Sequence, residues 1–195
     1  MNSISKLIET LEKSPKSKTI EKLIKLSEFE SAVDIPNQFE RLMGVWELRW
    51  SSSKSPVLNY SPLLNNFQIL DLDKSRALNF LSTKGFLGKL LSTNILAKLD
   101  IIDQKRINVT FEKAGIIGPQ VFGKNMVFLS EIKKAQTGWL DTTVLTDKLR
   151  VCRGYKGTTF ALLKREDLLI ADFFNPINNL VRLPFIYVHQ KHMLS

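Results

Sequence analysis

The side chains that could perform catalysis are few and scattered. His189 and His192 are the two histidines, and neither lies near a serine, aspartate or cysteine motif that would activate a nucleophile. Cys152 is the one cysteine, which excludes an internal disulfide and leaves no Cys/His spacing suited to zinc. No phosphate-binding loop, dinucleotide fingerprint or Gly-x-Ser-x-Gly motif occurs. The sequence therefore predicts a protein that is not an enzyme and that uses neither a metal nor a cofactor.

The charged side chains point instead to an anionic partner. Among 195 residues, 28 Lys and Arg outnumber 19 Asp and Glu, and the resulting net charge of +9 attracts either nucleic acid or an anionic membrane. The excess is concentrated in the second half of the chain, above all in segment 146–165. We expect this segment to dock on a membrane through Lys148, Arg150, Lys156, Lys164 and Arg165. Each such side chain near an anionic surface contributes roughly 1 kcal/mol.

Two alternatives to membrane docking follow from the same segment. A basic hairpin can be simply solvated, with no partner at all. Nucleic acid is not expected as a partner, because aromatic side chains are not interleaved with these charges at positions suited to base stacking.

The elements that must position these residues are mainly strands. Residues 1–35 show helical spacing twice, which predicts two short helices. From residue 36 to 165, short runs of alternating apolar and polar residues are separated by tight turns, and Trp46, Leu48 and Trp50 form the first of them. Such strands without intervening helices predict an antiparallel sheet that closes into a barrel or a sandwich.

Two segments depart from this alternation. In segment 86–99 the apolar residues follow a helical spacing, which predicts a helix or a lid over one barrel opening, able to touch a membrane or a ligand. Residues 166–195 are expected to pack on the barrel as a terminal strand or edge. No run reaches the roughly 20 apolar residues of a membrane span, and residues 1–12 resemble neither a secretory signal nor a transit peptide.

Two blocks of the sequence carry a resemblance to a known family. Residues 139–143 are Trp-Leu-Asp-Thr-Thr, and residues 147–160 follow the pattern Asp-x-Leu-Arg-x-x-Arg-Gly-x-x-Gly-x-x-Phe. Residues 42–52 match a Leu-x-Gly-x-Trp-x-Leu opening strand. Together they resemble the plastid lipid-associated proteins, or fibrillins, over about residues 1–165. One departure is Thr146 and Asp147, where the family commonly has an acidic pair.

The resemblance implies a lipocalin-like barrel whose interior holds an apolar molecule. Its ligand would be a quinone, carotenoid, isoprenoid or fatty acyl lipid handled at photosynthetic membranes. A member without a transit peptide would suit a cyanobacterium, bound peripherally on the cytoplasmic side of the thylakoid membrane. The alternative is a scaffold with a filled barrel, which binds a protein partner such as an isoprenoid-synthesising enzyme through segment 86–99 or the C-terminal segment.

The alternating strands also predict which side chains point inward. Trp46 is on the inward face, and the resemblance to a lipocalin-like barrel implies that it closes one end of the barrel, with the guanidinium of Arg153 as the candidate to stack on its indole. The candidates for lining the ligand cavity are the large apolar residues on the predicted inward faces: Leu48, Trp50, Phe67, Ile69, Phe80, Val109, Phe111, Trp139 and Phe160. Spacing alone does not separate a cavity lining from an ordinary core.

Overall fold

Eight antiparallel strands form a closed barrel in chain order, which confirms the prediction of a mainly β barrel. The computed structural model describes residues 2–85, 91–121 and 124–178. Each strand pairs with its neighbours in the sequence, and the last pairs with the first. The strands are β1 (Gly44–Ser51), β2 (Leu64–Asp71), β3 (Arg76–Thr83), β4 (Ser92–Ile101), β5 (Arg106–Val121), β6 (Lys124–Leu145), β7 (Leu149–Gly154) and β8 (Thr159–Lys164).

The helices lie outside this barrel. The two predicted N-terminal helices are present as α1 (Ser3–Lys13) and α2 (Ile20–Glu30), and a single turn, α3 (Phe39–Leu42), precedes β1. The last described helix is α4 (Ile170–Asn178). Three short 3₁₀ turns complete the order: η1 (Pro36–Gln38), η2 (Pro56–Leu58) and η3 (Leu72–Lys74).

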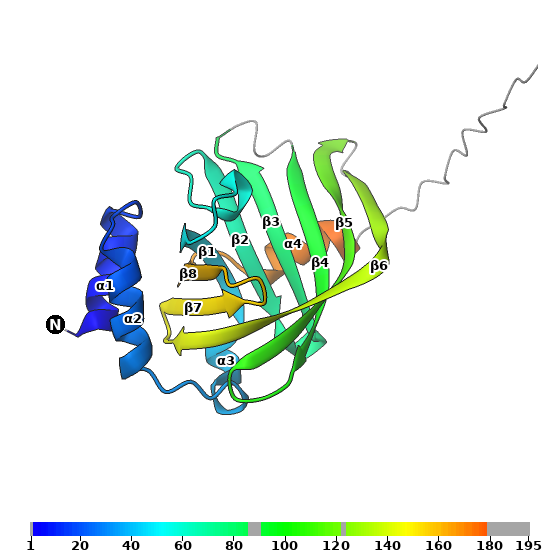
Figure 1. Cartoon of the computed structure of the whole chain (residues 1–195). Helices are drawn as coiled ribbons and strands as arrows, with labels where there is room; N and C mark the ends of the chain where they lie inside the picture. The colour runs from blue at the N-terminus through cyan, green and yellow to red at the C-terminus, as the bar shows by residue number, and fades with distance from the viewer. Residues whose placement is uncertain (1, 86–90, 122–123, 179–195) are drawn as a thin grey trace, which may run out of the picture.

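The barrel has two different ends. At the closed end lie segment 31–43 and the turns that join β2 to β3, β4 to β5 and β6 to β7. At the open end lie segments 52–63 and 155–158, the last residues of β3 and β5 and the first residues of β4 and β6. Strands β2 to β6 rise beyond β7 and β8 (Figure 1). β6 pairs with β7 only over Leu140–Leu145, and β1 pairs with β2 only over Gly44–Glu47. The wall of the barrel near the open end is therefore a curved sheet of β2 to β6.

The closed half of the interior is filled by apolar side chains. Trp46 is fully buried there, and its indole Nε1 donates a hydrogen bond of 2.8 Å to the carbonyl oxygen of Leu42. Around Trp46 pack residues of segment 31–43 and of all eight strands, among them Ile35, Leu70, Ala77, Leu99, Ile107, Leu145, Cys152 and Leu162. Because these residues come from every strand, they define the inside of the barrel.

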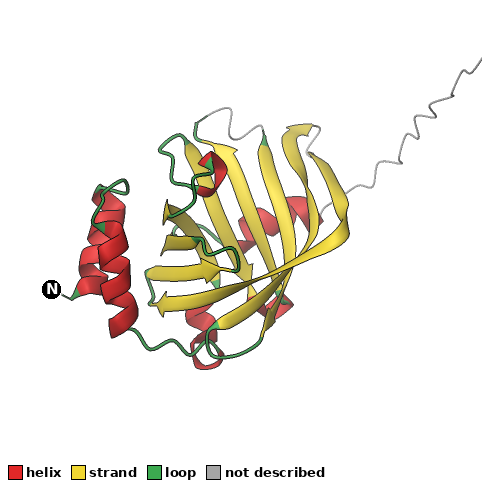
Figure 2. Ribbon diagram, in the orientation of Figure 1, coloured by secondary structure: helices red, strands yellow, loops and turns green. Residues whose placement is uncertain are grey.

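Helices α1 and α2 form a hairpin on the outer face of β7 and β8 (Figure 2). The Asn2 side chain accepts a hydrogen bond from the Ser5 amide and so caps the start of α1. Leu7 and Leu11 of α1 are fully buried against Val151 and Ala161 of the strands. This hairpin covers the outer side of the short strands with apolar contacts.

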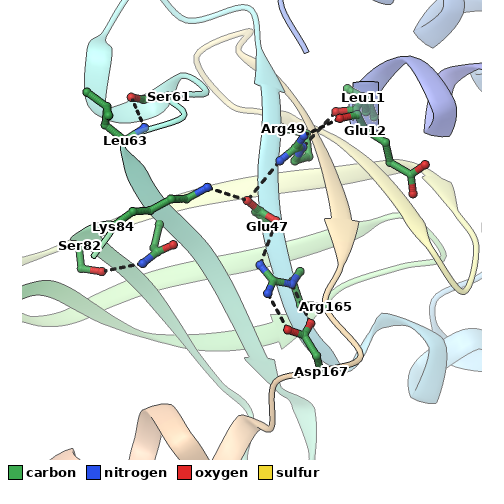
Figure 3. A network of polar contacts seen from close by, with 11 residues as sticks. Leu11, Glu12, Glu47, Arg49, Ser61, Leu63, Ser82, Lys84, Arg165 and Asp167 are labelled. Carbon is green, nitrogen blue, oxygen red and sulfur yellow. Dashed lines mark hydrogen bonds and ion pairs between the residues drawn. The ribbon is translucent and has the colours of Figure 1, made fainter. Parts of the chain in front are cut away.

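Buried or half-buried ion pairs attach these outer parts to the barrel. Glu47, on the outer face of β1, pairs with Arg49 at 3.4 Å, with Arg165 at 3.2 Å and with Lys84 at 4.0 Å (Figure 3). Arg49 also donates from Nε to the carbonyl oxygen of Leu11 at 3.0 Å, in the last turn of α1. An arginine at that position satisfies carbonyl groups that the helix leaves free. Glu47 thus links β1 to α1, β3 and the segment that leads to α4.

The described part of the C-terminal segment, residues 166–178, packs on the barrel as a helix rather than as the expected terminal strand or edge. Phe174 of α4 is buried against the outer faces of β1, β2 and β3, and Arg76 stacks on its ring at 3.8 Å. Phe173 makes edge-on contacts with Phe67 and Phe80, with ring centroids 5.8 and 5.1 Å away. These contacts cover the outer face of the sheet on the side away from the helical hairpin. Residues 179–195 lie outside the described residues.

The helix predicted in segment 86–99 is wrong for its described part. β4 begins at Ser92 and continues to Ile101 as a paired strand, and residues 86–90 lie outside the described residues. Apolar residues occur on both faces of this strand, because Ala97 packs inside the barrel and Leu96 packs under α4. A strand that is buried on both faces loses its alternation and can imitate a helical spacing.

Candidate ligand-binding site

The register of the strands decides which of the nine predicted cavity residues point inward. Leu48, Val109, Phe111 and Phe160 belong to the cluster inside the barrel. The inward placement of the other five, Trp50, Phe67, Ile69, Phe80 and Trp139, is wrong. Whether the four inside contact a ligand stays a prediction.

Coverage of the outer face explains most of these errors. Trp46 pairs with Gln68 in register, so Gln68 points inward, whereas its neighbours Phe67 and Ile69 point outward. Those two pack with Phe80 against α4, which makes the outer face as apolar as the inner face. Alternation then shows that one face of the strand is apolar, but it does not show whether that face points into the barrel or outward.

Local features explain why Trp50 and Trp139 point outward. The β1–β8 register shifts between Leu48 and Trp50, and the shift turns Trp50 toward the helical hairpin. Trp139 is the sequence neighbour of inward-facing Leu140 and lies on the outer face, where Arg106 stacks over its ring at 4.2 Å.

The open half of the interior holds inward-facing residues that the sequence analysis missed. Asn79 pairs with Gln68 and with Ile95, so Asn79, Ile95 and the positions two residues further along face inward. By the same register Ile116 and Phe128, which pair with each other across β5 and β6, face inward. Their exposed fractions are 41% and 59%, in contrast with the buried residues of the closed half. Large apolar side chains therefore face the interior at the open half without being covered.

A buried polar group lies inside the filled half of the interior. Arg150 is fully buried on the inner face of β7, so its prediction as a membrane-docking residue is wrong. Its Nη1 donates to Gln68 Oε1 at 3.3 Å, and its Nη2 lies 3.7 Å from Cys152 Sγ. The contact with Gln68 crosses the interior from β7 to β2. Burial raises the pKa of the Cys152 thiol, which keeps that group protonated beside Arg150.

The remaining predicted docking residues are divided between the two ends. At the closed end, Lys148 pairs with Glu12 at 2.8 Å, and Arg165 pairs with Asp167 at 2.6 Å. Asp167 and Glu47 raise the pKa of Arg165, so its charge is held in these contacts. Lys164 is half-buried at the same end. Lys156 is exposed in the turn between β7 and β8, at the open end.

Lys164 stacks on Trp46. The predicted cation at this place, Arg153, does not. The Lys164 ammonium lies 5.2 Å from the Trp46 ring centroid and donates to the Arg41 carbonyl oxygen at 2.9 Å. Burial lowers the pKa of Lys164. Arg153 faces outward and forms two hydrogen bonds of 2.8 and 2.7 Å with Glu28 of α2. Burial alone would raise the pKa of Glu28, but the bonds from Arg153 and Thr143 lower it overall.

The rim of the open half combines exposed apolar side chains with lysines. The described residues of this rim, 52–63, 83–85, 91, 118–121, 124–128 and 154–158, include no Asp or Glu. The exposed large apolar residues of this rim are Val57, Leu58, Leu63, Leu91, Met126, Phe128 and Tyr155, and its exposed lysines are Lys54, Lys84 and Lys156. The turns of the closed end differ, because acids such as Asp73, Asp103 and Asp147 alternate there with bases.

The sequence profile of the PAP_fibrillin family matches residues 3–163. The chain belongs to this family. The match covers the helical hairpin and the eight strands up to residue 163, and α4 lies beyond it.

Other comparisons were made with curated and solved proteins. The search of curated proteins found no match. Among solved structures, this fibrillin is similar to a streptavidin-like protein from Bacteroides eggerthii, with 16% identity and a TM-score of 0.40. That similarity covers 60% of this chain and 84% of the other. No helix within residues 2–85, 91–121 and 124–178 is long and apolar enough to cross a bilayer.

Proposed function

We propose that this fibrillin binds a lipophilic molecule in the open half of its barrel and handles it at the surface of a photosynthetic membrane. The ligand class is a quinone, carotenoid, isoprenoid or fatty acyl lipid, which family membership supports. The observation that carries the proposal is the exposure of inward-facing Ile116 and Phe128 above a filled closed half. A barrel of about eight strands can hold one small ligand.

Apolar burial supplies the affinity in this proposal. Covering apolar surface contributes about 25 cal/mol per Å², or about 1.5–3 kcal/mol for one fully buried side chain of the size of Ile or Phe. Several such side chains on the concave face of β3 to β6 therefore suffice for a ligand with a long apolar chain. The buried polar side chains of Arg150 and Gln68 would orient the ligand through its head group.

The rim supports docking through the open end. Each lysine near an anionic lipid surface contributes roughly 1 kcal/mol, and the rim segments carry no acid to offset this attraction. The exposed apolar residues beside the lysines, such as Val57 and Leu63, would enter the interfacial region of the bilayer. In this orientation a lipid can pass between bilayer and barrel without crossing water.

Extraction of the purified protein tests ligand binding. Organic solvent extraction followed by mass spectrometry should detect a co-purifying lipophile. The extracted protein should then take up an added quinone, carotenoid or fatty acid, measured by the quenching of tryptophan fluorescence. A protein that arrives empty and takes up none of them would contradict the proposal and would favour the scaffold with a protein partner.

Vesicle flotation tests the docking face. Lys54→Ala with Lys156→Ala should weaken binding to vesicles that contain phosphatidylglycerol by about 30-fold, because two lysines that each contribute roughly 1 kcal/mol are lost from the rim. Lys74→Ala with Lys105→Ala removes the same charge from exposed positions at the closed end and should leave binding nearly unchanged. Binding should also fall as salt rises, since exposed charges are screened. Equal losses from the two pairs would refute docking by the open end.

A further inference from the structure

The interior of the barrel contains a buried guanidinium without a counter-ion. Arg150 is fully buried; among the described residues, its Nη1 and Nη2 donate only to Gln68 and Cys152, and its Nε has no hydrogen-bond partner. None of the ion pairs found among residues 2–85, 91–121 and 124–178 includes Arg150. A charge in such surroundings is costly unless an anion or several acceptors compensate it.

The neighbours of Arg150 do not provide that compensation. Gln68 offers a neutral amide oxygen at 3.3 Å, at the long end of hydrogen-bond distances. Burial raises the pKa of the Cys152 thiol, so this group remains neutral. Glu47, the buried carboxylate on β1, lies on the outer face because its neighbours Trp46 and Leu48 point inward. Its charge is taken up by Arg49, Arg165 and Lys84 (Figure 3).

A second unpartnered polar group borders the same place. Thr142 of β6 pairs in register with Cys152, and its hydroxyl is buried without a hydrogen-bond partner. Arg150 Nη2 contacts the same residue, Cys152, from two positions earlier on β7. Two independent donors, the Arg150 guanidinium and the Thr142 hydroxyl, are thus left unsatisfied on the inner face, beside one residue. A carboxylate or phosphate offers several acceptor sites and can accept from both.

We propose that Arg150, with Gln68 and Thr142, anchors the anionic head group of a single-chain lipid whose tail lies along the open half of the barrel. The head is a carboxylate or a phosphate, and the tail contacts Ile95, Ile116 and Phe128. This rests on the proposed function, because it assigns the ligand class for the same interior. It selects acidic lipids from a range that otherwise includes neutral quinones and carotenoids.

Access to Arg150 requires a local rearrangement. Phe111, Leu140 and Phe160 point inward, are half-buried and pack against the closed-half cluster. They bound the filled half from above, so the head group must displace one or more of them to reach the guanidinium. Ligand binding is then expected to change the surroundings of aromatic side chains inside the barrel, which near-ultraviolet circular dichroism detects.

Three ligands with one chain test the anchor in the unmodified protein. Oleic acid, oleyl phosphate and oleyl alcohol share an apolar chain and differ in the head group. The proposal expects the two anionic ligands to bind at least about tenfold more tightly than the alcohol. Equal affinities would overturn the anchor while leaving the proposed function intact, whereas failure of all three to bind would contradict the proposed function. The tighter of the two anionic ligands identifies the head group.

A substitution then tests Arg150 itself. Arg150→Met keeps an unbranched apolar side chain and removes the guanidinium with its charge, so affinity for the preferred anionic ligand should fall by about tenfold or more. Affinity for oleyl alcohol should be retained, which also shows that the variant is folded. Arg153→Met, on the outer face, is the matched control and should bind the anionic ligand normally. Unchanged anion binding by Arg150→Met would refute the anchor, and the three-ligand comparison decides if that variant fails to fold.

Discussion

Along the same strands, inward positions near the closed end are buried, whereas those near the open end face solvent. On β5, Ile107 is 2% exposed and Ile116 is 41% exposed, although both are isoleucines on the inner face. The difference in exposure arises from the elements that face these two isoleucines across the interior of the barrel. Trp46 and segment 31–43 fill the closed end, while β7 and β8 are too short to face the upper parts of β5 and β6. Stability and ligand binding can therefore depend on separate residues of one sheet.

The largest expected effect comes from the closed half. Trp46→Ala should lower the free energy of unfolding by about 3–5 kcal/mol, because it removes a large side chain that is fully buried among residues of every strand. Urea denaturation measures the loss. Ligand affinity of the folded fraction should be nearly unchanged. A variant of normal stability that no longer binds ligand would contradict the assignment of Trp46 to the structural half.

The next effect belongs to the open half. Ile116→Ser with Phe128→Ser should reduce ligand affinity by about tenfold or more, because apolar surface that a ligand would cover is lost. The free energy of unfolding should change by only about 0.5 kcal/mol or less per site, since both side chains are exposed. Titration with a fluorescent acyl probe measures the affinity.

Val109→Ala, on the inner face of the closed half, is the matched control for these serines. It should lower stability and leave affinity for the acyl probe unchanged, because Val109 is 7% exposed within the filled cluster. If Val109→Ala and the two serine substitutions altered stability and affinity in the same proportion, the division into two halves would be wrong.

The smallest effect concerns the helical hairpin outside the closed half. Glu28→Gln removes the carboxylate that accepts from Arg153 and Thr143, and should cost about 1 kcal/mol at neutral pH. The folded pKa of Glu28 lies below the reference value of 4.5, so its contribution is present above that pH and is lost as pH falls through the folded pKa. Denaturation of both proteins at several pH values should show the difference shrinking in acid. A constant difference would mean that the carboxylate charge is not responsible.

Local patterns were sufficient to predict most of the elements and the family. Helical spacing marked α1 and α2, alternation marked β1, β2, β5 and β8, and two motif blocks around residues 42–52 and 139–160 indicated the fibrillins. Each of these signals is carried by residues close together in the sequence. A structure was not needed to obtain them, because the hydrophobic period depends on backbone geometry that neighbouring residues share.

Which face of a strand points inward could not be predicted, and with it most of the candidate site. Phe67 and Phe80 lie outside because α4 covers them, and Leu96 imitates a helical spacing for the same reason. The basic residues of segment 146–165 were expected on one surface, yet Arg150 is inside the barrel and Lys148 and Lys156 lie at opposite ends. Alternation and charge counts do not record what packs against a residue from elsewhere in the chain.

The sequence by itself determined a basic, mainly β fibrillin with two N-terminal helices and a buried Trp46. Only the tertiary structure decided that one half of the barrel is filled, that the other half exposes its inner face, and that the filled half holds an arginine without a counter-ion among the described residues. The physical reason is that burial and ion pairing depend on contacts between distant segments. The lengths of β7 and β8 relative to β6 set those contacts, and spacing within one strand carries no information about them.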